Sequence, residues 1–393
     1  MTDWGLLDPG AADTTGTDDD AVLGAMVEVE RALLRAWGSE LDEFLDAQAD
    51  ALEAASLDRA ALIEGVAHDA VPVVTLVPAL RAQLVAAGLL ADRLHLGATS
   101  QDVVDTALML VARDAMHGTR AALVEAGSHL AALAEAERRS PRIARSIARH
   151  AEASTLGVLA AGWLDGVASA LETVDALAFP VQFGGAVGTG TAADAAAGRP
   201  GAADAVRAGL AAELGLADPG RAWHAERTPV LAVASAAAAV VAALGRIAGD
   251  VTLLSREEFG EVRLAGGGGS SAMPHKRNPV DAVAITAAAV ESPGLLQIVA
   301  SAALAGDERS AGRWHAEWSS SRRILRLARS ASTAASRLLA GLEFDRDRSA
   351  RILTHAGPAG ERPDRGVLDA ASDRIVDRAV ARFAALSERQ SRP

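Results

Sequence analysis

The chain has 393 residues, a net charge of −13 and no cysteine, and half of its residues are hydrophobic. This length suffices for one large domain or a few modest ones, and the lack of cysteine excludes disulfides and thiolate metal sites. The acidic balance argues against a nucleic-acid partner, because phosphate binding needs a basic surface. Residues 1–10 lack the basic and apolar segments of a secretory signal, so we expect a cytoplasmic protein.

Ala and Leu dominate the hydrophobic residues, and aromatic residues make up only 3% of the chain. Small and unbranched side chains of this kind favour closely packed helices, so the composition predicts an all-α fold. The order of helical patterns divides the chain into a small N-terminal helical domain over 1–100, a long central bundle over 101–342 and a C-terminal helical segment over 343–393.

The first hundred residues alternate short helical patterns with breaks, and longer patterns follow. Ser100 or Asp102 can cap a helix that runs through 103–136. A second helix is predicted from about 154 to 178, followed by a loop rich in Gly and Ala over 182–201.

The segment 230–254 is apolar almost all round. Thr228 as N-cap and Pro229 in the first turn predict a helix start. A membrane span is one interpretation of this segment. Its Ala-rich composition and the early Arg246 and Asp250 favour the other interpretation, a buried central helix of a bundle with no membrane contact.

The segment 266–279 contains the residues best suited to chemistry. Four glycines precede Ser270 and Ser271, which offers a backbone that can close over a ligand. Lys276 is the only lysine of the chain and Asn278 its only asparagine. Both stand before a predicted helix that runs toward residue 304, where a helix N-terminus already favours anions. A Gly/Ser linker ahead of a capped helix is the alternative.

Several segments carry a family resemblance. Residues 269–279 read Gly-Ser-Ser-Ala-Met-Pro-His-Lys-Arg-Asn-Pro, which resembles the signature of the fumarase/aspartase superfamily. Residues 96–107 and 312–318 are similar to segments of the 3-carboxy-cis,cis-muconate cycloisomerases of that superfamily. Such matches extend from about 26 to 352. The resemblance implies a fumarase/aspartase-like long helical bundle with small N-terminal and reduced C-terminal helical domains.

The resemblance also implies roles for individual residues. Ser270, His150 and Lys276 would be catalytic, with Ser270 as base and Lys276 as a stabiliser of the aci-carboxylate, while either Ser270 or His150 would handle the proton. The residues that would bind substrate carboxylates or neighbouring groups are Thr99, Ser100, Gln101, Ser154, Thr155, Ser271, Met273 and Asn278.

These roles fit the chemistry of the residues. Preorganised donors and an ammonium group lower the energy of an enediolate-like intermediate. A nearby ammonium can activate a serine, and histidine titrates near neutral pH. The structural alternatives are a hydrogen-bonded core histidine at His150 and a simple helix cap at Thr99 and Ser100. The nine histidines show no metal-ligand spacing, so we expect no metal site.

Two departures bear on the activity. Ile147 stands where the C–N lyases of the superfamily have a histidine, which favours the cycloisomerases. The C-terminal segment 343–393 is shorter than in related chains.

The implied reaction is the cofactor-free lactonisation of 3-carboxy-cis,cis-muconate in protocatechuate catabolism. The alternatives are a fumarate-releasing lyase of the adenylosuccinate type and an inactive helical scaffold. The resemblance further implies a homotetramer with shared active sites that acts on a small polycarboxylate.

Overall fold

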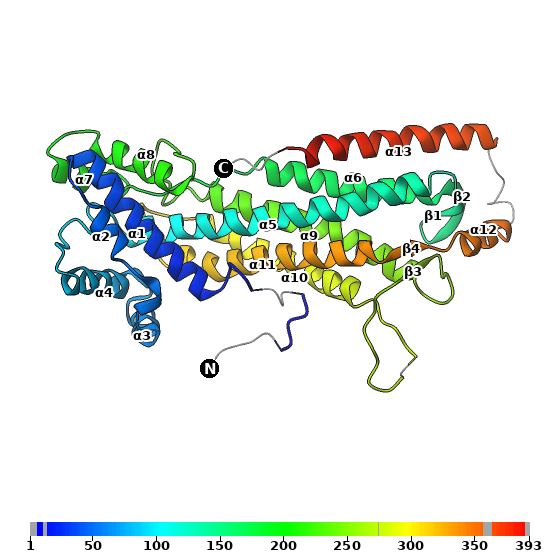
Figure 1. The fold of residues 1–393 in the computed structure, drawn as a ribbon, viewed down its shortest axis with the longest axis horizontal. Helices are drawn as coiled ribbons and strands as arrows, with labels where there is room; N and C mark the ends of the chain where they lie inside the picture. The colour runs from blue at the N-terminus through cyan, green and yellow to red at the C-terminus, as the bar shows by residue number, and fades with distance from the viewer. Residues whose placement is uncertain (1–5, 11–13, 274, 357–363, 390–393) are drawn as a thin grey trace.

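The computed structural model of the chain describes residues 6–10, 14–273, 275–356 and 364–389. Its helices form an elongated body in which long helices run side by side and shorter helices gather at one end (Figure 1). The all-α prediction is confirmed, although two short antiparallel strand pairs join the helices.

Long helices form the central bundle and share one hydrophobic core. They are α5 (Ser100–Ala136), α6 (Leu156–Asp175), α9 (Thr228–Leu254), α10 (Val280–Ala302) and α11 (Arg313–Ala340). Small alanine side chains fill much of this core, which lets the helices approach closely. Trp163 is a large exception: it is fully buried, stacks on Phe344 and donates its indole N–H to Asp250 at 2.8 Å.

The helix starts follow local capping chemistry, with two shifts from the sequence prediction. Thr99, not Ser100 or Asp102, is the N-cap of α5, and its N–H donates to the Asp102 carboxylate at 2.9 Å. The predicted N-cap Thr228 is wrong by one residue, because it is already the first residue of α9. Such shifts are small because several polar residues near a helix start can satisfy its free N–H groups.

The N-terminal part of the chain packs against one end of the bundle (Figure 1). Its elements are α1 (Asp19–Leu41), α2 (Asp46–Asp50), the 3₁₀ helix η1 (Ala54–Ser56), α3 (Arg59–Asp69) and α4 (Val73–Ala86). Two helices from the middle of the chain, α7 (Thr191–Ala197) and α8 (Ala202–Leu214), join them, and α8 packs against α1. A second hydrophobic core joins these helices to the start of α5 and to Trp314. Trp37 fixes the entry to α5 by donating to the Leu96 carbonyl at 2.9 Å.

The opposite end of the bundle carries an antiparallel hairpin that the sequence did not predict. It consists of β1 (Pro141–Ser146) and β2 (Arg149–Thr155), so residues 154 and 155 belong to a strand and α6 begins two residues later than expected. Nearby, β3 (Val262–Leu264) pairs with β4 (Leu342–Phe344). β3 leads directly into the segment that resembles the superfamily signature.

The C-terminal helices cover the side of this end. α12 (Arg346–Thr354) lies against β1, and α13 (Arg365–Ser387) runs along α6 (Figure 1). α13 joins the bundle core, and its Phe383 ring packs on Gly127 of α5, where a Cβ atom would lie 2.2 Å from the ring. The glycine therefore provides the space that the aromatic ring occupies.

Two bundle helices, α9 and α10, are long and apolar enough to cross a membrane by length and composition. The bundle buries 50% of the most apolar window of α9 and 28% of that of α10, so a single chain covers only half of the apolar helix that was predicted to be buried. The outer face of α10 instead exposes Val283, Val290 and Ile298. One chain alone therefore leaves an apolar helix face uncovered.

Candidate active site

The signature segment forms a loop that projects from the bundle between β3 and α10 (Figure 1). Gly268 and Asn278 close its neck with two backbone hydrogen bonds of 3.0 Å. Met273 and Lys276 are exposed on the loop. Pro274 of the signature lies outside the described residues.

The hydroxyl of Ser270 sits in a local turn that offers it hydrogen-bond donors. Its Oγ accepts the N–H of Met273 at 3.1 Å and that of Ala272 at 3.3 Å. Two N–H groups aimed at one oxygen stabilise negative charge on that oxygen, as an alkoxide base requires. The Asn278 amide donates to the Gly269 carbonyl at 3.3 Å, which holds both ends of the loop together.

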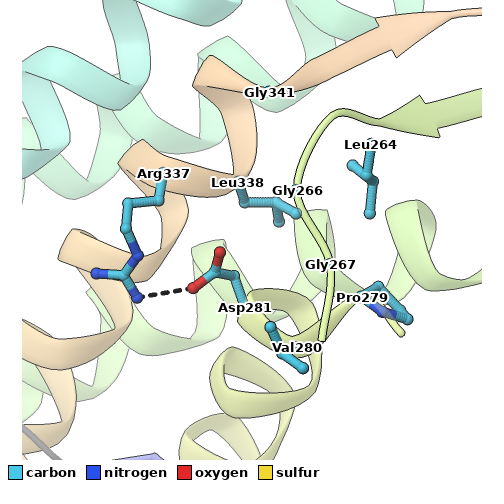
Figure 2. A pocket seen from close by; sticks show the side chains of 9 residues that line it. All are labelled: Leu264, Gly266, Gly267, Pro279, Val280, Asp281, Arg337, Leu338 and Gly341. Carbon is cyan, nitrogen blue, oxygen red and sulfur yellow. Dashed lines mark hydrogen bonds and ion pairs between the residues drawn. The ribbon is translucent and has the colours of Figure 1, made fainter. Parts of the chain in front are cut away.

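A small void lies at the foot of this loop. It is lined by residues of β3, the loop neck, the start of α10 and the end of α11, including the Arg337–Asp281 ion pair at 2.7 Å (Figure 2). No residue predicted to be catalytic or to bind substrate lines it. The void therefore belongs to the stem of the loop and not to the site of chemistry.

His150 lies on the exposed part of the β1–β2 hairpin, opposite Arg145. The connecting turn places Ile147 and Ala148 at positive φ, 49° and 61°, and Ile147 is 96% exposed. A β-branched residue in this region is strained, and such strain is common at functional sites. Ser154 lies in the same hairpin.

Thr155, predicted to bind substrate, has a structural role in this chain. Its side chain is buried, accepts the Val158 N–H at 3.1 Å as the N-cap of α6, and lies 3.0 Å from the Ser372 hydroxyl. The residue therefore joins β2 to α6 and α13. The carboxylate-binding role is not supported for a hydroxyl with these partners.

The third predicted segment lies at the start of α5. Thr99 accepts a hydrogen bond from Arg309 at 2.8 Å, which brings a cation to this segment, and Ser100 is half-exposed. Gln101 differs from the prediction because it is fully buried: its amide donates to Asp105 at 3.2 Å and to the His224 carbonyl at 2.9 Å. Both amide hydrogens thus have partners inside the protein.

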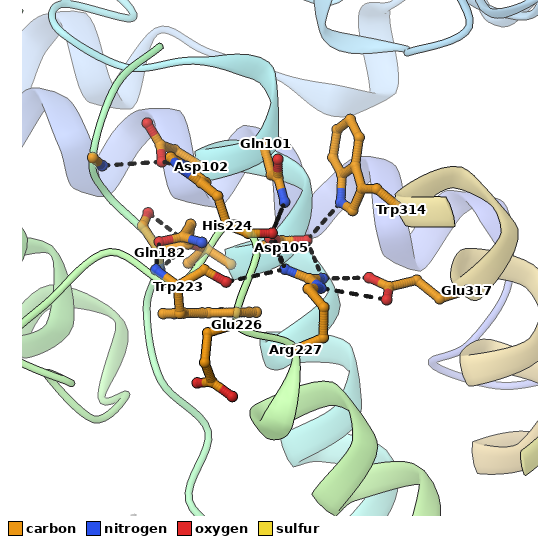
Figure 3. A network of polar contacts seen from close by, with 12 residues as sticks. Gln101, Asp102, Asp105, Gln182, Trp223, His224, Glu226, Arg227, Trp314 and Glu317 are labelled. Atoms are coloured by element: carbon orange, nitrogen blue, oxygen red, sulfur yellow. Dashed lines mark hydrogen bonds and ion pairs between the residues drawn. The ribbon is translucent and has the colours of Figure 1, made fainter. Parts of the chain in front are cut away.

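Gln101 belongs to a buried polar network that joins α5, α9 and α11 (Figure 3). Arg227 is at its centre, with Asp105 at 2.7 and 3.0 Å and Glu317 as a second ion-pair partner. Trp314 also donates to Asp105, at 2.9 Å. One guanidinium therefore compensates two buried carboxylates.

Burial and the close charges of this network shift the pKa values of Glu317 and Arg227. Burial, with a smaller contribution from Asp105, raises the pKa of Glu317 to about 7, although Arg227 opposes the change. The pKa of Arg227 is raised because its two carboxylate partners outweigh the effect of burial. The folded chain therefore favours the protonated form of Glu317 more than an exposed carboxyl would.

The predicted site residues do not form one cluster within a single chain. The 37 residues of α5 separate Thr99 from the hairpin end of the bundle by about 55 Å, at 1.5 Å per residue. Ser270, Ser271, Met273, Lys276 and Asn278 share one loop, whereas His150 and Ser154 share the hairpin. In the part of the chain that the structure describes, no group of three or more His, Asp or Glu side chains forms a metal-binding cluster.

The sequence patterns gave no role to Arg309, Arg227 or Glu317, although Glu317 lies in the segment 312–318. The available signal was a charged residue on the apolar face of an amphipathic helix, because Glu317 of α11 is buried on the same face as Trp314. Its partner Arg227 lies ninety residues away in sequence, so only the fold shows that the charges meet.

Comparisons with known proteins identify the family of the chain. A family model described as lyase matches residues 21–294. Nitrosuccinate lyase of Streptomyces davaonensis is 43% identical over 91% of this chain and 78% of the relative, and 3-carboxy-cis,cis-muconate cycloisomerase of Bradyrhizobium diazoefficiens is 37% identical over 88% and 78%. The crystal structure of 3-carboxy-cis,cis-muconate lactonizing enzyme from Pseudomonas putida has a TM-score of 0.82 and 32% identity, covering 97% of this chain and 90% of that chain. The chain is therefore a member of the lyase family of the fumarase/aspartase superfamily.

Proposed function

We propose that the protein transfers a proton at the carbon next to a carboxylate of a small polycarboxylate, and that its reaction is the lactonisation of 3-carboxy-cis,cis-muconate. The observation that carries this proposal is the Ser270 hydroxyl with two N–H donors, in one loop with Lys276 and Asn278. These groups suit an aci-carboxylate intermediate, whose negative charge needs donors in place before the reaction. The relatives named as cycloisomerases support the substrate.

In this reaction one substrate carboxylate adds to a double bond as a side chain protonates the carbon next to another carboxylate. The C–O bond forms as the C=C bond is consumed, and no external reactant is needed. Ser270 and His150 are the two candidates for the proton donor, because each lies on an accessible segment of its chain.

A second candidate reaction is elimination from nitrosuccinate, favoured by the 43% identity to nitrosuccinate lyase. A base would remove the proton next to a carboxylate, the C–N bond would break with its electron pair on nitrite, and fumarate would form. A nitro group is planar and isoelectronic with a carboxylate, so nitrosuccinate presents three groups of similar shape. A site for the tricarboxylate 3-carboxymuconate thus suits this substrate as well.

Two assays on purified protein without added cofactor separate the reactions. Loss of the ultraviolet absorbance of 3-carboxy-cis,cis-muconate with lactone formation supports the cycloisomerase. Nitrite release from nitrosuccinate with appearance of fumarate supports the lyase. Turnover of neither substrate by folded protein contradicts both, and adenylosuccinate then tests the remaining lyase alternative.

We also propose that copies of the chain form a homotetramer with shared sites. The separation of about 55 Å along α5 keeps Thr99 from the hairpin within one chain, and the exposed apolar face of α10 suits burial against another copy. Mixing the inactive variants His150→Ala and Lys276→Ala by coexpression should restore part of the activity if different chains supply these residues to one site. A monomer by light scattering, or no recovery, contradicts the proposal.

A further inference from the structure

A buried ion pair joins the β1–β2 hairpin to the segment that leads into the signature loop. Arg145 of β1 places Nη1 2.6 Å from a carboxylate oxygen of Glu261, and these side chains are 12% and 0% exposed. Arg145 lies opposite His150 in the hairpin. Glu261 directly precedes β3, so the chain runs from this carboxylate through three strand residues into the loop of Ser270.

The Glu261 end of the pair is fixed to the bundle. Its backbone N–H donates to the Leu254 carbonyl at 2.9 Å, and its carbonyl accepts the N–H of Asp345 at the same distance. The guanidinium of Arg145 also lies over the Phe259 ring, 4.9 Å from its centroid. Arg145 therefore holds the hairpin against this segment through an ion pair and a cation–π contact.

The two charges depend on each other. Apart from the ion pair, the buried guanidinium nitrogens of Arg145 and the carboxylate oxygens of Glu261 have no hydrogen-bond partner among the described residues. Removing Glu261 would leave the Arg145 guanidinium buried without its ion-pair partner and close to a second cation, Arg142, a strongly unfavourable state. The hairpin thus has one electrostatically favoured position on the bundle.

We propose that Arg145 and Glu261 are positioning residues, whose ion pair fixes the hairpin of His150 relative to the stem of the Ser270 loop. This inference rests on the proposed function. A displaced Arg145 would move the opposite His150, and a shift of about 1 Å at a reacting group can cost about a hundredfold in rate. The pair therefore acts through His150 and the loop, without contact to substrate.

The test compares Glu261→Gln with Asp175→Asn. The control breaks another ion pair of low exposure, Arg120–Asp175 at 2.6 Å, which joins α5 to α6 away from the hairpin turn and the loop. We expect Glu261→Gln to speed amide hydrogen exchange in both 141–155 and 262–279, and to lower kcat at least tenfold with KM changed less than about twofold. Glu261→Asp should recover part of kcat, and Asp175→Asn should leave both segments and kcat near wild type.

Faster exchange across the whole bundle, or a kcat equal to that of Asp175→Asn, would show that the pair stabilises the fold without positioning the hairpin. Wild-type protein that converts neither 3-carboxymuconate nor nitrosuccinate would instead refute the proposed function. In that case the exchange comparison still decides whether the pair holds the hairpin and the loop stem together.

Discussion

Replacing Glu317 by Gln should change the pH dependence of stability in a defined direction. The carboxyl is buried beside Arg227 and Asp105, and its pKa in the folded chain is raised to about 7 from an ordinary value of 4.5. A folded chain that binds this proton more tightly than the unfolded chain loses stability as pH rises from about 4.5 to about 7. At about 1.4 kcal/mol per pH unit, the loss amounts to about 3 kcal/mol.

The amide that Glu317→Gln introduces cannot titrate, so the variant should lack this loss. The free energy of unfolding of the variant minus that of wild type should therefore rise by about 3 kcal/mol between pH 4.5 and pH 8. Urea unfolding followed by tryptophan fluorescence at several pH values measures both chains. The matched control is Glu343→Gln, at an exposed position of β4. A difference that does not change with pH would refute the reasoning about the buried network.

Three further predictions concern the loop, the C-terminal helix and the N-terminal end. Lys276→Ala should lower turnover by about a hundredfold or more while thermal melting stays unchanged, because the side chain is exposed; full activity would exclude the loop from the mechanism. Phe383→Ala should lower the free energy of unfolding by about 3–5 kcal/mol in urea titrations, since the ring is buried against Gly127; a loss below about 1 kcal/mol would contradict this packing. Burial lowers the pKa of His95 but its contact with Glu30 raises it above the ordinary value. His95→Gln should therefore destabilise the protein at pH 5.5 more than at pH 9, and an equal loss would contradict the ion pair.

The sequence predicted the long helices well, because apolar periodicity and capping residues are local signals. It did not predict the β1–β2 hairpin. The two residues of its turn, Ile147 and Ala148, take positive φ without the Asn or Gly that usually marks such turns. β1 contacts α12, which lies about two hundred residues away in sequence, and local sequence patterns do not show such a contact.

The candidate site was predictable where its residues share one segment, as in the loop of Ser270. The burial of Gln101 and Thr155 was not predictable, because their hydrogen-bond partners come from remote parts of the chain. Gln101 bonds to the carbonyl of His224, and Thr155 contacts Ser372. A polar residue in a matched motif can thus hold the scaffold of a site, and only its partners distinguish this role from ligand binding.

The only lysine of the chain lies exposed on the signature loop. Amine-selective reagents attack uncharged amino groups, so in this protein they have one side-chain target, Lys276, besides the terminal amine. A fluorophore or cross-linker attached there would report on the loop without any engineered residue. Protection of Lys276 from acylation by bound polycarboxylates would also rank ligands before any turnover assay is available.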